Sequence, residues 1–193
     1  VGTAHLMGVM EKYDLLPVMN FKYGDHKDCH KIDMEVWKKH FTQGVPDGCW
    51  LGCTMMCAKG VDDFELRTGP YQGSRVLVAG TEYETAAALG SNMAVFDPLY
   101  VIEQNFYCDT YGICTISWGN IMAFIMECWE AGVLDKERTG GLDFTWGNAK
   151  DALECMHQLS RGEGFGLIAG LGVRKMKEMF IEKGCGDVSF LND

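Results

Sequence analysis

Apolar side chains recur at intervals of three and four residues over most of this chain, a spacing that places them on one face of an α-helix. The clearest example lies between Thr115 and Glu130, where Phe124, Ile125 and Cys128 fall on one side. The pattern then stops at Ala131-Gly132. The same spacing predicts further helices over residues 3–14, 33–42, 98–112, 148–161 and 168–183, and one more that starts at Thr81.

Local signals place several of these boundaries. Asp97-Pro98 combines a preferred N-cap residue with a proline at the first helical position. Thr3 is a candidate cap for the first helix, which should stop before Pro17. Residues 74–80, SRVLVAG, predict a short strand without an obvious partner. Together these features predict a mainly α, multi-helix fold that forms a single domain over residues 1–193.

The composition fits a globular domain and limits the partners. The chain has 193 residues, of which 47% are hydrophobic, and it carries a net charge of −10. That charge argues against a nucleic-acid surface, which needs Lys and Arg to replace phosphate counterions. No apolar run approaches about 20 residues and no targeting segment is visible, so we expect no transmembrane segment and a cytoplasmic location. The chain starts without methionine, and we expect it to be a piece of a longer polypeptide.

Nine cysteines are many for a chain of this size. An odd number without a signal peptide favours a reducing compartment and metal or redox duties over a disulfide framework. Cys128 and Cys155 stand among apolar residues at helical spacing and should be small buried core residues. Cys29 and Cys185 lie in polar or glycine-rich stretches, and their role stays open.

Three of the cysteines, Cys49, Cys53 and Cys57, are each four residues from the next. This spacing places them on one helical face or on the turns of a loop wrapped around one object. Iron–sulfur clusters are held by closely spaced thiolates of this kind. Two alternatives remain: the cysteines pack in a core, or they bind zinc or another divalent metal without the usual CxxC knuckles.

A second candidate lies in residues 108–119, at the junction of two predicted helices. Asp109 precedes Gly112 by three residues, and Cys114 follows that glycine by two. A helix start offers free amides to an anionic ligand and polarises a nearby thiol toward thiolate. Asp109 could accept hydrogen bonds from an amino-bearing heterocycle. Alternatively, Asp109 or Thr115 only caps the second helix and Cys114 only packs.

A third candidate is the acidic start of the helix at Thr81. Glu82 and Glu84 flank Tyr83 there. In a dry site such a glutamate can have a raised pKa and act as a general acid or base. The simpler interpretation is favourable charge at a helix N-terminus.

The histidines form one further candidate. His26, Cys29 and His30 are spaced so that a metal could bind them, although their polar, glycine-flanked segment favours a solvated loop.

Taken together and in this order, the segments resemble the aldehyde:ferredoxin oxidoreductase family of tungsten enzymes. The resemblance spans nearly the whole chain. It implies a helical middle domain, accompanied elsewhere in the polypeptide by an N-terminal β domain and a C-terminal helical domain. It is carried by Gly2-Thr3, residues 16–21, the cysteine triplet, residues 82–85 and 88–92, residues 109–117, Ala123-Phe124, residues 126–128 and residues 141–143.

The resemblance also assigns roles. It implies that Cys49, Cys53 and Cys57 hold a [4Fe–4S] cluster with one more cysteine from the following domain, although the family spacing is CxxCxxxC rather than CxxxCxxxC. Asp109, with Gly112 and Ile113, matches the DxxG segment that binds one of two pterins of a tungsten bis-pyranopterin. Glu84 matches a glutamate near the metal that is associated with proton transfer.

Cys114 departs from the pattern of the aldehyde-oxidising members, which usually have Asp at this position. A thiolate there could bind tungsten directly and leave fewer open positions for substrate oxygen. This feature resembles the tungsten subunit of class II benzoyl-coenzyme A reductase.

The resemblance therefore implies an oxidoreductase that passes low-potential electrons from the cluster to tungsten and reduces benzoyl-CoA to a cyclic dienoyl-CoA. An aldehyde:ferredoxin oxidoreductase is the alternative, and a non-catalytic zinc-binding interaction module is an alternative of another class. The implied partners are an acyl-CoA thioester or an aldehyde as substrate, and an iron–sulfur electron-transfer subunit or ferredoxin in an oligomeric complex.

Overall fold

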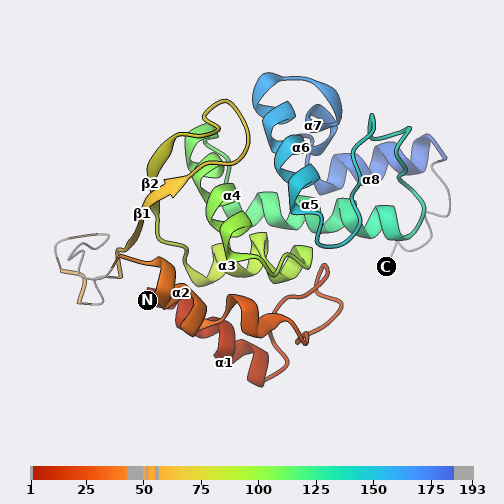
Figure 1. The fold of residues 1–193 in the computed structure, drawn as a ribbon. Helices are drawn as coiled ribbons and strands as arrows, with labels where there is room; N and C mark the ends of the chain where they lie inside the picture. Colours follow the sequence, from red (N-terminus) through yellow and green to blue (C-terminus); the bar gives the residue numbers. More distant parts are fainter. Residues whose placement is uncertain (1, 43–49, 51, 55–56, 185–193) are drawn as a thin grey trace.

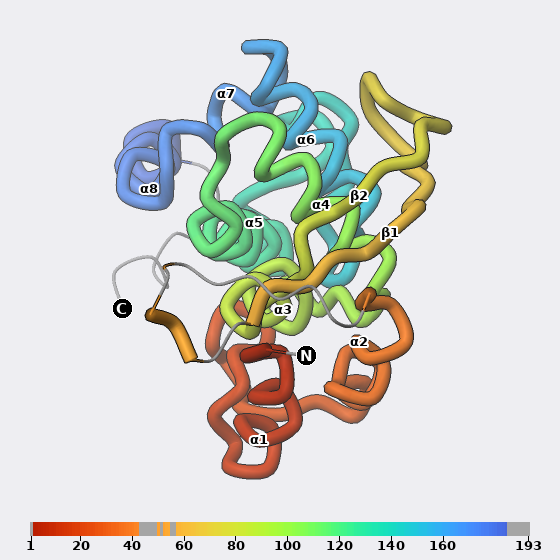
Figure 2. The backbone as a smooth tube through the Cα atoms, turned by 90° about the vertical axis from the view of Figure 1, so that its left-hand side faces the viewer, coloured from red at the N-terminus to blue at the C-terminus, as the bar shows by residue number. Residues whose placement is uncertain are grey.

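Three layers of helices make up the chain, and a β-hairpin lies along one side of the middle layer (Figure 1). The structure is a computed structural model that describes residues 2–42, 50, 52–54 and 57–184. Seen from the side, the middle layer separates α1 and α2 from α6, α7 and α8 (Figure 2). The mainly helical class predicted from the apolar spacing is confirmed.

The first layer holds two short α-helices, each preceded by a 3₁₀ turn. These elements are η1 (Gly2–His5), α1 (Leu6–Lys12), η2 (Cys29–Ile32) and α2 (Met34–His40). The prediction that Thr3 caps one continuous helix is wrong, because α1 begins only after His5 and the Thr3 hydroxyl binds Glu82 instead.

The middle layer contains the helices that carry the candidate site. They are α3 (Tyr83–Leu89), the 3₁₀ turn η3 (Ser91–Met93), α4 (Pro98–Tyr111) and α5 (Thr115–Glu130). The predicted start of α4 is confirmed, since the Asp97 carboxylate accepts a hydrogen bond from the amide of Leu99 at 2.9 Å. The buried face of α5 supplies much of the core.

Helices α3 and α5 pack unusually close to each other. A Cβ atom added at Gly119 of α5 would lie 2.3 Å from the carbonyl oxygen of Ala88 in α3. The absence of a side chain at Gly119 therefore allows the two backbones to touch. Because Thr85 meets Thr115 one turn earlier in both helices, α3 and α5 run parallel and start at the same end.

The third layer consists of α6 (Ala149–Arg161), α7 (Gly164–Ala169) and α8 (Val173–Glu182). Asn148 caps α6 as its sequence position suggests, by accepting from the Asp151 amide. The single helix predicted over residues 168–183 is wrong. The chain turns between α7 and α8, where Gly172 has a left-handed φ of +80° that favours glycine.

The strand predicted over residues 74–80 has a partner that its own sequence did not reveal. Strand β1 (Gly60–Glu65) pairs antiparallel with β2 (Arg75–Ala79), and a bulge between Val61 and Phe64 interrupts the register. The bulge breaks the alternation of apolar and polar residues by which a strand is recognised.

Buried polar contacts attach this hairpin to α4. Glu103 of α4 is fully buried, and its carboxylate accepts hydrogen bonds from the amides of Arg67 and Thr68 at 2.9 and 2.8 Å. The Arg67 guanidinium and the Thr68 hydroxyl donate to the same carboxylate. Asn105, two residues further along α4, donates to the carbonyl oxygen of Ala79. These side chains hold the hairpin against α4 at two places, the loop after β1 and the end of β2.

Across the part of the chain that the structure describes, no helix combines the length and the apolar character that crossing a membrane requires.

Candidate cofactor site

The turn between α4 and α5 displays Asp109 and Cys114 on the surface. α4 ends at Tyr111, and Gly112 then adopts a left-handed φ of +70°. The Ile113 amide closes the turn by donating to the carbonyl oxygen of Cys108 at 2.8 Å. A Cβ atom at Gly112 would meet nothing within 4 Å, so the glycine serves the backbone conformation and leaves the outer side of the turn open.

Cys114 is the N-cap residue of α5, and it is exposed. The hydroxyl and amide of Ser117, followed by the amide of Ile116, favour a negative sulfur and lower the pKa of the Cys114 thiol. A helix N-terminus has this effect because its first amides have no partners within the helix. The thiol is therefore accessible and inclined toward thiolate, which suits a soft-metal ligand or a nucleophile.

Asp109 belongs to the last turn of α4 and does not cap α5. Partial desolvation by the surrounding chain raises the pKa of its carboxyl. A carboxyl with these properties can either accept hydrogen bonds from a ligand amino group or donate one when it is protonated.

The start of α3 lies beside the start of α5. Glu84 is in the first turn of α3 and is exposed, and the hydroxyl of the next residue, Thr85, lies 3.0 Å from the hydroxyl of Thr115. Glu84 and Cys114 are each one residue away from this contact. Two candidates that are 30 residues apart in the sequence therefore share one end of a parallel helix pair.

Glu82 differs from Glu84, although the sequence presents them alike. Its carboxylate accepts from the amide and hydroxyl of Thr3 and from the ammonium of Lys59. Burial opposes ionisation of Glu82, but the hydrogen bonds from Lys59 and Thr3 outweigh it and lower its pKa. The carboxylate of Glu82 thus connects η1 and Lys59 to the start of α3.

Only part of the cysteine triplet belongs to the described residues. Cys49 lies outside them, whereas Cys53 and Cys57 are described and are half-buried. Residues 52–54 and 57–59 are not helical, which agrees with the loop interpretation of the triplet and not with a helical face. Within the described ranges, no three His, Cys, Asp or Glu side chains are grouped as metal ligands.

The backbone at Gly2 comes very close to Cys57. A Cβ atom at Gly2 would lie 3.1 Å from the Cβ of Cys57 and 2.8 Å from the Nζ of Lys59. Because the amide of Tyr83 donates to the Thr3 hydroxyl, this contact brings the cysteine segment to the start of α3. The first residues of the chain, the third cysteine and the acidic start of α3 converge at one place.

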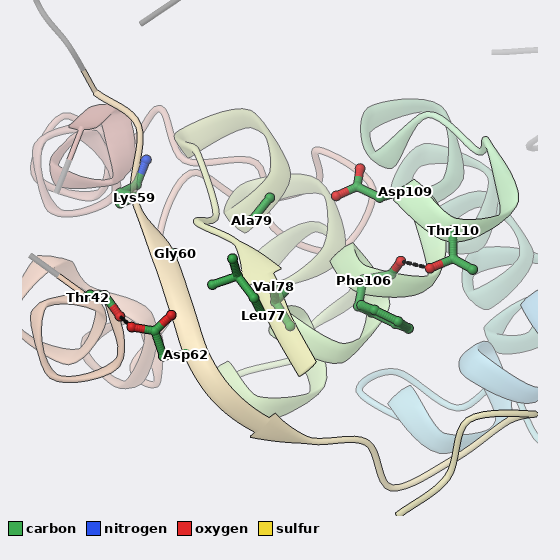
Figure 3. Close-up of a pocket in the computed structure, with 10 residues that line it drawn as sticks. All are labelled: Thr42, Lys59, Gly60, Asp62, Leu77, Val78, Ala79, Phe106, Asp109 and Thr110. Atoms are coloured by element: carbon green, nitrogen blue, oxygen red, sulfur yellow. Dashed lines mark hydrogen bonds between the residues drawn. The ribbon is translucent and has the colours of Figure 1, made fainter. Parts of the chain in front are cut away.

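A cleft of about 440 Å³ separates the hairpin from the C-terminal half of α4 (Figure 3). Asp109 stands at one side of it and Lys59 at the other, with the apolar residues of β2 between them. The carboxylate of Asp62 accepts a hydrogen bond from Thr42 within the lining. The complete lining is formed by Thr42, Lys59, Gly60, Asp62, Leu77, Val78, Ala79, Phe106, Asp109 and Thr110.

The remaining cysteine and histidine candidates have ordinary structural surroundings. Cys128 and Cys155 are fully buried, as predicted, and burial raises the pKa of Cys128 to about 12. Cys29 is buried as well. The His26 ring stacks on Phe96 with centroids 4.6 Å apart, and Cys29 and His30 begin the 3₁₀ turn η2, so the segment is not the solvated loop that its polarity favoured.

Residues 1–186 match the protein family described as aldehyde ferredoxin oxidoreductase, domains 2 and 3. The chain belongs to the aldehyde ferredoxin oxidoreductase family. This match covers the turn with Asp109 and Cys114, the start of α3 and the cysteine segment, and it confirms the resemblance on which their predicted roles rest.

Curated relatives of this family member extend well beyond it. A tungsten-containing aldehyde ferredoxin oxidoreductase of Pyrococcus horikoshii is 31% identical over 184 residues, which cover 93% of this chain and 28% of the relative. An aliphatic sulfonate oxidoreductase, WOR-like subunit, of Pyrococcus furiosus is 29% identical over 160 residues, covering 81% of this chain and 24% of the relative. The chain thus spans about a quarter of the length of the curated relatives it matches.

Sequence reasoning missed Lys59 and the cleft. Lys59 stands before a strand in a mixed segment, AKGVDDF, and no local pattern separates it from a surface lysine. Only the packing of η1, β1 and α3 around its side chain gives it a place in the site.

Proposed function

We propose that this chain forms the middle helical domain of a tungsten–pterin oxidoreductase. The observation that carries the proposal is that the turn with Asp109 and Cys114, between α4 and α5, adjoins the start of α3 with Glu84, which comes from a separate segment. The family supports an oxidoreductase, and its curated tungsten-containing members support the choice of metal.

The described residues fit such a cofactor. The Cys114 thiol is exposed, has a lowered pKa and is a soft donor, as tungsten prefers. Asp109 lines a cleft of suitable polarity for a flat, amino-bearing ring, and the open side of Gly112 leaves room beside it. When bound, the tungsten–pterin group would supply the electron chemistry that side chains cannot perform.

The protein's own residues would bind, orient and handle protons. Asp109, with Gly112 and Ile113, would hold the pterin, with the carboxylate accepting hydrogen bonds from its amino group. Cys114 would ligate the metal. Glu84 would hold or deliver a proton at its carboxylate, and the part of the enzyme beyond this chain would have to exclude water from it.

Cys49, Cys53 and Cys57 would hold a [4Fe–4S] cluster together with a cysteine from the following domain. Cys53 and Cys57 fit because both are half-buried in an irregular segment, and because the glycine backbone at residue 2 forms a close cradle for Cys57. A ferredoxin or an iron–sulfur subunit would deliver or accept the electrons.

For the reaction itself, we propose reduction of benzoyl-CoA to a cyclic dienoyl-CoA. The specific observation in its favour is Cys114, since a protein thiolate on the metal leaves fewer positions for substrate oxygen. Oxidation of an aldehyde to a carboxylate is the alternative, and the names of the curated relatives favour it. In that case Cys114 would not ligate the metal.

Activity assays on the purified whole enzyme separate the two reactions. Turnover of benzoyl-CoA with a low-potential donor is the expected result. Aldehyde-dependent dye reduction without any turnover of benzoyl-CoA would eliminate the first reaction in favour of the second.

X-ray absorption at the tungsten edge tests Cys114 separately. Two pterins supply four sulfurs, so we expect five in the wild type and four in Cys114→Ser at unchanged tungsten content. Four sulfurs in the wild type would refute ligation by Cys114.

Metal analysis tests the non-catalytic alternative. A zinc-binding interaction module would contain zinc and neither tungsten, iron nor acid-labile sulfide. The proposed enzyme would contain tungsten and about four irons for each cluster.

A further inference from the structure

Lys59 is a buried cation to which neither the family resemblance nor the proposed function assigns a role. Its side chain is only 6% exposed, whereas most lysines keep their ammonium group in water. The ammonium forms an ion pair with Glu82 and donates to the backbone carbonyl oxygen of Cys57 at 3.2 Å. It also lies over the ring of Phe41, 5.3 Å from the centroid.

The same place joins three segments that are far apart in the sequence. Thr3 donates its amide and hydroxyl to Glu82, and Gly2 packs directly against Lys59 and Cys57. Gly2 has a left-handed φ of +53°, and a Cβ atom there would lie 3.1 Å from the Cβ and 3.2 Å from the carbonyl oxygen of Cys57, so this approach favours glycine. The pair of Lys59 and Glu82 is therefore in contact with both Thr3 and Cys57, with the cation on the side of Cys57.

We propose that Lys59 and Glu82 are positioning residues for the electron-transfer end of the site, where they fix the Cys57 backbone and set the reduction potential of the cluster bound there. This inference rests on the proposed function, because it requires that Cys57 hold an iron–sulfur cluster.

The two charges act on the cluster with opposite signs. Reduction adds an electron to the cluster, so a nearby cation stabilises the reduced form and a nearby anion destabilises it. Because Lys59 is buried, solvent screens its charge less than it would screen a surface lysine. Charge, hydrogen bonding and solvent exposure are the means by which proteins adjust cluster potentials.

This difference in sign separates electrostatic tuning from plain structural support. If the ion pair only holds the loop in place, loss of either partner disturbs Cys57 in the same way. If the pair tunes the cluster, loss of the cation and loss of the anion move the potential in opposite directions.

The test is a redox titration of the cluster, followed by electron paramagnetic resonance, in the whole purified holoenzyme. Lys59→Met removes the cation, Glu82→Gln removes the anion at equal size, and Lys59→Arg keeps the positive charge. We expect a more negative midpoint potential in Lys59→Met and a more positive one in Glu82→Gln. Lys59→Arg should remain near the wild type. Iron content and melting temperature show whether each variant is folded and loaded.

Shifts of the same sign in Lys59→Met and Glu82→Gln, or unchanged potentials in loaded variants, would overturn the inference and leave the proposed function intact. If Lys59→Met fails to fold, Glu82→Gln and Lys59→Arg still decide the question. A tuning pair gives a more positive midpoint potential in Glu82→Gln and an unchanged midpoint potential in Lys59→Arg, and any other result would overturn the inference. A wild-type enzyme with tungsten but without a cluster signal would refute the cluster part of the proposed function, and this inference with it.

Discussion

Two regions of the candidate site are built by different means. In the first, the helix-end region of residues 82–85 and 109–117, backbone turns and small residues set the positions of Glu84, Asp109 and Cys114, of which only Asp109 lines the cleft. In the second, the hairpin region of residues 57–80, buried charged and polar side chains tie the strands to α3 and α4. The comparison shows that a helix end can place a ligand side chain through backbone turns formed by neighbouring residues. A two-stranded hairpin, in contrast, depends on contacts with residues that are distant in the sequence.

The largest effect on stability should come from the hairpin region, through Glu103. Replacement by alanine leaves the partly buried Arg67 without its carboxylate and the amides of Arg67 and Thr68 without acceptors, and breaking a buried pair of this kind costs about 3–5 kcal/mol. We therefore expect Glu103→Ala to lower the free energy of unfolding by that amount in urea denaturation.

The matched control for this variant is Glu65→Ala in the same hairpin. Glu65 is exposed and pairs only at the surface with Arg75, so its replacement should change stability by less than about 1 kcal/mol. Equal losses in the two variants would mean that Glu103 does not hold the hairpin.

The next largest effect should come from the helix-end region, through Gly119. Alanine at this position has no room against the backbone of Ala88, and overpacking of this kind costs about 1–3 kcal/mol. Gly119→Ala should also push α3 away from α5 and thereby separate Glu84 from Cys114, which a loss of tungsten at equal protein concentration would report.

Gly8→Ala provides the control for Gly119→Ala. Gly8 lies in α1, and a Cβ atom there would meet nothing within 4 Å. Alanine should therefore stabilise this helix by about 0.5–1 kcal/mol. If both variants are destabilised, the effect at Gly119 comes from the loss of a glycine in general and not from the contact between α3 and α5.

A smaller effect is expected from the contact of Thr85 with Thr115. The hydrogen bond between their hydroxyls should contribute about 0.5–1.5 kcal/mol, so a double-mutant cycle with Thr85→Val and Thr115→Val should give a coupling energy in that range. A coupling energy near zero would show that close packing at Gly119 alone holds the two helix starts together.

The smallest effect on stability should come from Ser117→Ala, which instead changes the pKa of the Cys114 thiol. The lowered pKa means that Cys114 becomes thiolate at a lower pH than an ordinary thiol, and the loss of the Ser117 hydroxyl should raise that pH. In the apo-protein, the pH profile of Cys114 alkylation, followed by peptide mass spectrometry, should move to higher pH in this variant.

Cys108 gives the internal reference for that experiment. Burial raises its pKa to about 12, so it should remain unmodified at pH values where Cys114 reacts. Similar reaction rates for the two cysteines would contradict the exposed position of Cys114.

The local sequence was sufficient for the boundaries of α4 and α5. Asp97-Pro98 identifies the start of α4, Gly112 its end, and the apolar spacing the whole of α5, because caps and glycine turns are decided by a few neighbouring residues. The order of residues along the chain is accordingly enough to identify Asp109 and Cys114 as neighbours of a turn. Their roles as ligands remain predictions.

The hairpin region and its contacts with α3 and α4 could not be predicted from the local sequence. A bulge hides the alternation of β1, and Glu103, Lys59 and Glu82 look like ordinary helix and loop charges in the sequence. The division of α7 from α8 was missed for a similar reason, because apolar spacing continues across the turn at Gly172.

The sequence by itself thus determined a mainly helical chain, its strongest boundaries and the short motifs that resemble tungsten enzymes. The tertiary structure decided that the helix starts with Glu84 and Cys114 lie side by side, that Glu82 pairs with Lys59 and that the Lys59 side chain is buried next to Cys57. The physical reason is that caps and periodicity act over a few residues, whereas burial and ion pairing depend on contacts between distant segments, such as those of Thr3 and Tyr83, which are 80 residues apart.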